Sequence, residues 1–177
     1  MKAEKTLPLL QVFSWIIYIG ISIKTGTIII SYLVSVFINP QASADLGLSL
    51  DLSSLMEFNL LYYHFMLSWV IVIWMLKASI MYQVIQIFNK LKLVQPFTEE
   101  VYSHIYKMSQ LALSTGLLSY GAYTFSRWIS KFGVDLSNLQ EFISGRAEFL
   151  FMAAILFVIS QVFKRGIEIQ SENELTI

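Results

Sequence analysis

One lysine lies in the middle of a long apolar run, where a charged side chain is rare. Lys24 shares a helical face with Thr27 and Ser31, and no Asp or Glu lies in the same run. At the centre of a bilayer an ammonium group costs at least roughly 2.5–3.5 kcal/mol. We expect this polar face to turn inward, as a polar cavity, an ion-sensing site or a contact between subunits. The alternative is that Lys24 snorkels along its own helix.

A second lysine, Lys77, stands about 20 residues into the second apolar run, where a bilayer-spanning helix ends. There it can reach the headgroups and fix the depth of the helix, or it can have a more specific role. The two histidines, His64 and His104, are expected too far apart to share a metal ion. We expect each of them to make interfacial hydrogen bonds.

Other catalytic and binding chemistry finds no support in the sequence. The chain has no cysteine, so disulfides and thiol chemistry are excluded. No Asp lies in an apolar run, and no phosphate-binding or dinucleotide motif is present. The formal net charge is zero, with no basic face suited to nucleic acid. The sequence therefore predicts a protein that is not an enzyme, has no cofactor or metal site and does not bind nucleic acid directly.

Four apolar runs dominate the chain, which is 56% hydrophobic and 14% charged. A helix needs roughly 20 apolar residues to cross a bilayer, and soluble domains carry roughly 25% charged residues. We predict one all-α membrane domain over residues 1–177, an integral four-helix antiparallel bundle with lipid as its solvent. Its segments are spans at about 9–37, 58–80, 106–128 and 147–165, outer loops 39–57 and 130–146, an inner hairpin 81–105 and a tail 166–177.

The distribution of basic residues predicts the orientation. With the N-terminus inside, the inner side holds Lys2, Lys5, Lys90, Lys92, Lys107, Lys164 and Arg165, and the outer side holds Arg127, Lys131 and Arg146. Positive charge gathers on the cytoplasmic side of membrane proteins. Both termini are therefore expected in the cytoplasm.

The second and third helices are expected to extend into the cytoplasm as a hairpin. Thr98 is a plausible N-cap, with Glu99 and Glu100 in the first turn. Amphipathic stripes run along both stems, formed by Met81, Val84, Ile85 and Phe88 and by Val101, Ile105, Met108 and Ala112. Either the stripes bury each other or lie in the headgroups, or they form a surface for a partner.

Two further segments have a predicted structure. A small-residue seam on the third helix, at Ala112, Gly116 and Ser119, is typical of close helix packing within one chain or between copies. A short amphipathic helix is expected around residues 50–56, on the outer membrane face.

Two motifs resemble those of a known family. They are Phe88-Asn89-Lys90 followed by residues 95–101, and the C-terminal stretch 159–177, which ends in Gly-Ile-Glu-Ile-Gln-Ser-Glu-Asn-Glu-Leu-Thr-Ile. Together with four apolar runs, they resemble the bacterial membrane family called domain of unknown function 2975, over essentially the whole chain. The resemblance implies a multi-pass protein of the bacterial inner membrane without an established activity. It also implies a small helix-turn-helix regulator, often encoded beside family members, as a partner.

The leading functional hypothesis is a non-enzymatic membrane protein that binds a cytoplasmic partner through hairpin and tail. The docking candidates are Phe88, Pro96 and Phe97 in the hairpin and Gln170, Glu172, Asn173 and Glu174 in the tail. The alternative is a small channel or transporter subunit that acts as a homo-oligomer around Lys24.

Overall fold

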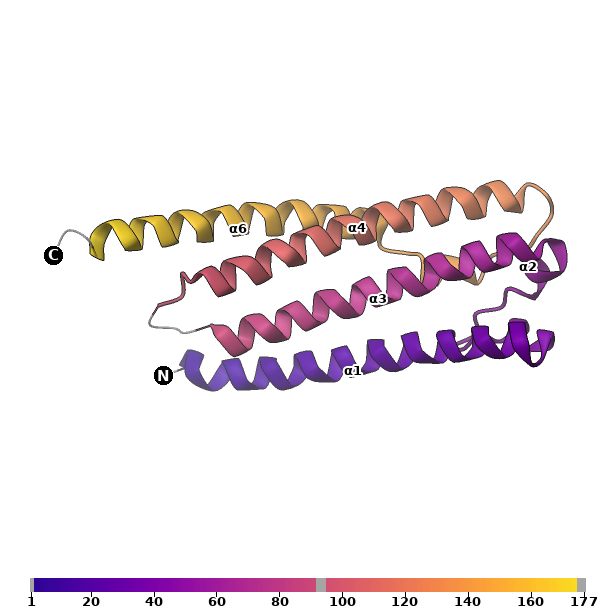
Figure 1. The fold of residues 1–177 in the computed structure, drawn as a ribbon, viewed down its shortest axis with the longest axis horizontal. Helices are drawn as coiled ribbons and strands as arrows, with labels where there is room; N and C mark the ends of the chain where they lie inside the picture. Colours follow the sequence, from indigo (N-terminus) through magenta and orange to yellow (C-terminus); the bar gives the residue numbers. More distant parts are fainter. Residues whose placement is uncertain (1, 92–94, 175–177) are drawn as a thin grey trace.

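Helices form nearly all of the chain in the computed structural model, which describes residues 2–91 and 95–174 (Figure 1). The side chains of residues 2–6, 173 and 174 lie outside the description. The four long helices are α1 (Lys2–Phe37), α3 (Leu60–Lys90), α4 (Glu99–Ser130) and α6 (Arg146–Glu174). The short ones are the 3₁₀ helix η1 (Pro40–Ala44), α2 (Ser53–Phe58) and α5 (Leu139–Phe142).

Three helical segments of the described chain are long and apolar enough to cross a membrane. They are Leu7–Phe37, Leu60–Lys90 and Leu139–Glu172, most of which is α6. The helix α4 is as long but more polar, and it is not one of the three. The all-helical prediction is confirmed, together with helices suited to a membrane.

Side-chain caps set two helix boundaries. The carboxamide oxygen of Asn59 accepts hydrogen bonds from the N–H groups of Leu61 and Tyr62, at 2.9 and 3.1 Å. Asn59 has extended backbone, so α2 and α3 are separate helices. The predicted cap at Thr98 is confirmed, because its hydroxyl accepts from the N–H of Val101 at 3.3 Å.

The four long helices lie in a row in chain order, α1–α3–α4–α6 (Figure 1). The most extensive packing joins α4 to α6, followed by α3 to α4 and α1 to α3. The two edge helices, α1 and α6, do not pack extensively on each other. The predicted four-helix antiparallel bundle is therefore not confirmed. An open row is compatible with a lipid solvent, in which apolar helix faces gain little by leaving the lipid.

The helix α6 is shifted along its own axis relative to α4. It begins beside the middle of α4, where Gly116 contacts the carbonyl oxygen of Arg146, and it runs past the beginning of α4 (Figure 1). The rings of Phe97 and Phe163 are 5.3 Å apart, which places the end of the apolar run of α6 beside the predicted inner hairpin. The predicted cytoplasmic extension of helices two and three is therefore not confirmed. The surplus length of α3 and α4, by which we mean the part that exceeds what a membrane crossing needs, lies beyond the start of α6.

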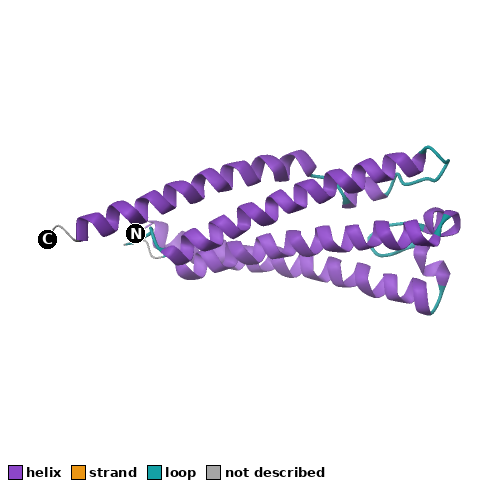
Figure 2. Ribbon diagram, turned by 45° about the horizontal axis from the view of Figure 1, so that its top comes forward, coloured by secondary structure: helices purple, strands orange, loops and turns teal. Residues whose placement is uncertain are grey.

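Both predicted outer loops are folded onto this surplus length (Figure 2). After that prediction, we call the end of the molecule where they lie its outer end and the opposite end its inner end. Leu50, Leu52 and Leu55 of the first loop are fully buried, as are Leu139 and Ile143 of the second. They form one core with the outer halves of α3 and α4. The helix α2 lies three residues later than the predicted one and packs on protein. The loop 131–145 runs back along the axis of α4, from the end of that helix to the level of Gly116. At about 1.5 Å per residue of helix, this distance is about 20 Å.

Candidate functional site

Lys24 lies at the centre of a cluster of aromatic rings. Its ammonium nitrogen is 4.4 Å from the ring centroid of Trp74 on α3 and 5.0 Å from that of Phe142 on α5. The two rings are themselves 6.1 Å apart. A cation over an aromatic face is attracted by the ring quadrupole, by about 2 kcal/mol or more when the pair is desolvated. The folded second loop thus helps to solvate Lys24.

Lys77 belongs to the same cluster. Its ammonium nitrogen is 4.8 Å from the Trp74 centroid and 5.6 Å from that of Phe149, in the first turn of α6. The structure therefore brings two lysines that are far apart in the sequence to one indole ring. We call Lys24, Trp74, Lys77, Phe142 and Phe149 the cation–aromatic cluster.

A third cation stands where α6 begins. The guanidinium carbon of Arg146 is 3.7 Å from the ring centroid of Tyr123 on α4. Among the described residues, the ion pairs are Lys90–Glu100 at 3.3 Å and Arg165–Glu168 at 2.8 Å, both exposed. The cations of this region are thus paired with rings rather than with carboxylates.

The other polar residues of the predicted face of α1 do not join Lys24 in the cluster. Thr27 is exposed, donates its hydroxyl proton to the carbonyl of Ile23 and lies against Gly47 of the first loop. Ser31 is half-buried. The polar residues of α1 that are buried are Ser14, Thr25 and Ser35. The buried face of α1 is therefore displaced by one residue from the predicted face, because Thr25 rather than Lys24 is buried. The exception is the outer end of the helix, where Ser35 is buried.

Hydrogen bonds between side chains join α1 to α3 at the outer end. Ser35 Oγ and the hydroxyl of fully buried Tyr63 are 2.6 Å apart, and the hydroxyl of Tyr32 is 2.9 Å from His64 Nδ1. His104 Nδ1, at the other end, is 2.9 Å from Gln83 Oε1. Each histidine thus makes a side-chain hydrogen bond to a neighbouring helix. In the described part of the chain, no group of His, Asp and Glu is arranged to hold a metal ion.

The inner end holds the predicted docking residues of the hairpin. The rings of Phe97 and Phe163 are 5.3 Å apart, and Gly166 lies directly against Phe97. Phe88 and Pro96 are half-buried. Val101, Ile105, Met108 and Ala112 are buried, so the predicted stripe of α4 packs inward. The hairpin residue that lies beside the tail is therefore Phe97.

The predicted tail is helical as far as Glu174, as the continuation of α6. Gln170 is half-buried and Glu172 is exposed. The side chains of Asn173 and Glu174 lie outside the described residues. Arg165 donates to Glu168 one turn later, at 2.8 Å. The tail is thus a helical surface of fixed direction up to residue 174.

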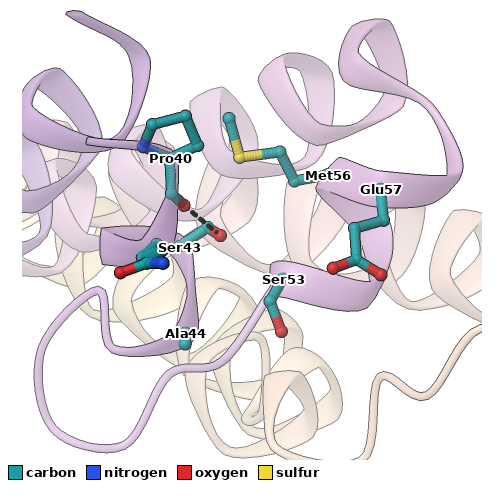
Figure 3. A pocket seen from close by; sticks show the side chains of 7 residues that line it. Pro40, Ser43, Ala44, Ser53, Met56 and Glu57 are labelled. Atoms are coloured by element: carbon teal, nitrogen blue, oxygen red, sulfur yellow. Dashed lines mark hydrogen bonds between the residues drawn. The ribbon is translucent and has the colours of Figure 1, made fainter. Parts of the chain in front are cut away.

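Hollows also lie outside the cluster. A cavity of about 380 Å³ separates η1 from α2 and is lined by Pro40, Gln41, Ser43, Ala44, Ser53, Met56 and Glu57 (Figure 3). The hydroxyl of Ser43 donates to the carbonyl of Pro40 at 2.7 Å, so it is occupied within the loop. A second cavity, of about 340 Å³, is lined by Tyr18, Ala78, Ser79, Tyr82, Gln83, Lys107 and Leu111.

Sequence reasoning missed the aromatic half of the cluster. Trp74 stands one helical turn before Lys77, and this spacing could have paired them. Phe142 carries no such signal, because it lies in a loop whose path depends on tertiary packing.

The described part of the chain is helical, and three of its segments are long and apolar enough to cross a membrane, which are the features of the class of membrane proteins. Within that class the chain belongs to the family described as "Protein of unknown function (DUF2975)", whose family model matches residues 54–177. The predicted resemblance is thereby confirmed, although the match leaves out α1. No curated protein and no solved structure matches the chain.

Proposed function

We propose that this chain is a non-enzymatic, multi-pass protein of the bacterial cytoplasmic membrane that binds a protein partner at its inner end. Both termini would lie in the cytoplasm, as the excess of basic residues on that side favours. The family assignment supports the membrane placement but carries no activity.

In this proposal, the apolar part of α6 sets the position of the bilayer along the helices. Its apolar part runs from Ala147 to Phe163, between Arg146 and the pair Lys164 and Arg165. At about 1.5 Å per residue, this part is about 26 Å long, close to the thickness of a hydrocarbon core. Large apolar side chains along it, such as Phe151 and Val162, are exposed and suited to lipid.

The observation that carries the docking proposal is the course of α6 beyond α4. The last turns of α6 continue past the beginning of α4 and stand apart from the other helices (Figure 1). Phe97 fixes their direction through its contacts with Phe163 and Gly166. A helix anchored at its base can bind a groove in a partner at a lower entropic cost than a flexible tail can.

The surface of these turns indicates the chemistry of the partner. Ile169 is 46% exposed and lies between the acidic residues Glu168 and Glu172. A partner with an apolar groove edged by basic residues would complement this surface. A small helix-turn-helix regulator, which the family resemblance suggests, has the basic residues that such a groove needs.

Site-specific photocrosslinking tests the proposal. Benzoylphenylalanine would replace Ile169 in one variant and Phe151, an exposed residue in the apolar run, in a matched control. In cells of the native host, we expect a discrete protein adduct at position 169 and none at position 151. A third variant carries benzoylphenylalanine in place of Glu168. The proposal would be contradicted if the variants at positions 169 and 168 both gave no adduct, or if the variant at position 151 gave the same adduct.

The alternative, a channel or transporter subunit that works as an oligomer, has one observation in its favour. Lys24 and Lys77 lie together without a described carboxylate partner, as they would beside an anion path. Anion flux into liposomes that contain the purified chain tests it. Flux that Lys24→Met and Lys77→Met leave unchanged, or the absence of flux, removes this reason.

A further inference from the structure

We propose that the cation–aromatic cluster binds a phosphate group, which either a phospholipid headgroup or free phosphate can supply. The lysines Lys24 and Lys77 would bind its oxygens, and Trp74 would contribute an N–H donor.

The ammonium groups of Lys24 and Lys77 both lie over the ring of Trp74. They lie 4.4 Å and 4.8 Å from the Trp74 centroid, although they come from different helices. Lysine stems have several rotatable bonds, so both groups can turn from the ring toward a common anion. An ammonium–phosphate contact of about 2.7–2.9 Å is a charge-assisted hydrogen bond, roughly twice as strong as a neutral one.

Among the described residues, no carboxylate forms an ion pair with Lys24 or Lys77. The ion-paired carboxylates of Glu100 and Glu168 belong to the inner end and bind other cations. Two half-buried ammonium groups repel each other, and the repulsion grows as the surroundings become less polar. A bound dianion or monoanion would remove this repulsion and satisfy both cations at once.

Uncharged donors point to the same conclusion. Trp74 Nε1 is buried and has no hydrogen-bond partner in the structure. A buried N–H without an acceptor is uncommon and is explained when an acceptor binds there. Phe149 contacts Lys77 from the first turn of α6, and its own N–H donates to the carbonyl of Gly145 at 2.8 Å. The N–H groups of the helix that precede it lack helical acceptors, and the dipole favours an anion there. Gly145, just before this helix, has no side chain that could accept from them.

The position of the cluster along α6 explains why a lipid can supply the phosphate. The cluster lies at the beginning of α6, where the apolar run ends and Arg146 stands. If α6 crosses the bilayer, phospholipid phosphates lie at this level, and the rings of Phe142 and Phe149 can cover the adjoining glycerol. This depth argument rests on the membrane placement proposed above. The charge argument does not, so the two can fail separately.

Binding would be measured on the purified full chain in two settings. In the first, nanodiscs of a neutral glycolipid, which carries no phosphate, are compared with nanodiscs that also contain phosphatidylglycerol, by thermal unfolding and native mass spectrometry. In the second, inorganic phosphate is titrated in lipid-free detergent, against chloride at equal ionic strength. The variants are Lys24→Met, Lys77→Met and the double variant. Lys131→Met, at an exposed lysine of the second loop, is the matched control.

We expect the wild-type chain to be stabilised by at least one of the two probes. Each single Met variant should weaken binding at least about tenfold, as the removal of one partner from a buried charge pair does. The double variant should lose the response, and Lys131→Met should keep it. A response only to phosphatidylglycerol identifies the lipid as the source, and a response in lipid-free detergent identifies free phosphate.

Two results would overturn the proposal. One is a wild-type chain that responds to neither probe. The other is a double variant that responds as the wild type does. If the double Met variant fails to fold, the pair Lys24→Arg and Lys77→Arg keeps both charges and should retain binding. A failure of the partner crosslink at Ile169 would leave this outcome unchanged, because the two sites are at different ends of α6.

Discussion

Gly116 of α4 lies directly against α6: a Cβ at this position would be 2.8 Å from Leu150 Cγ and 3.1 Å from the carbonyl oxygen of Arg146. The backbones of the two most extensively packed helices meet here at a distance that only glycine allows. The predicted small-residue seam is thus used within one chain, with Ala112 and Ser119 buried beside it.

Replacement of this glycine should separate the two helices. Gly116→Ala puts a methyl group against a backbone oxygen, which cannot move without the helix, and we expect a loss of about 1–3 kcal/mol in the free energy of unfolding. Gly20→Ala is the control, because nothing lies within 4 Å of its Cβ. There the gain in helix propensity should leave stability unchanged or raise it by up to about 1 kcal/mol. Thermal unfolding in detergent measures both, and equal behaviour of the two variants would contradict the close contact.

Removal of the cap at Thr98 should loosen the beginning of α4. Its hydroxyl accepts from the N–H of Val101 at 3.3 Å, and Thr98→Ala leaves this donor without a side-chain acceptor. We expect a loss of about 1 kcal/mol, and Thr98→Ser should retain most of the stability. Hydrogen exchange at the N–H of Val101 reports the change locally. Equal protection in both variants would show that the cap does not stabilise this turn.

The buried pair of Ser35 and Tyr63 should show a coupling energy. Ser35→Ala leaves the hydroxyl of a fully buried tyrosine unpaired, which costs about 1–3 kcal/mol. Tyr63→Phe removes the unpaired group, so the double variant should be less destabilised than the sum of the single variants. Ser22→Ala serves as the control, because its hydroxyl donates only to the carbonyl of Tyr18 in its own helix. Strict additivity of Ser35→Ala and Tyr63→Phe would show that the contact has no energetic role.

The second loop should behave as part of the core. Phe142 is 1% exposed and packs against Trp74, so Phe142→Ala should cost about 3–5 kcal/mol. Phe132, in the same loop, is 55% exposed, and Phe132→Ala should cost much less. Chemical unfolding in detergent compares the two. A loop that does not fold onto the helices would make both losses equally small.

The sequence was sufficient for the features that depend on neighbours along the chain. The lengths of the apolar runs predicted the long helices, and the hydroxyl at Thr98 before two acidic residues predicted the start of α4. The spacing of Val101, Ile105, Met108 and Ala112 predicted the buried stripe of that helix. These are local signals, because caps and helical periodicity act over one or two turns.

The cluster could be predicted only in part. The cost of a charge within an apolar run identified Lys24 and Lys77 separately. Their meeting at Trp74, and the part that Phe142 has in it, depends on the contact of α1 with α3 and on the path of a loop. Nothing in the spacing of these residues carries that information.

What the sequence determined by itself is therefore the solvent and the elements: helices apolar enough for lipid, with their caps and buried stripes. Tertiary structure alone decided how the helices line up. The return of the second loop starts α6 beside Gly116 rather than at the end of α4 and leaves the four helices in an open row. The physical reason is that apolar residues spread around a helix do not specify which side packs or at what height. Close contacts such as that of Gly116 with Leu150 decide both.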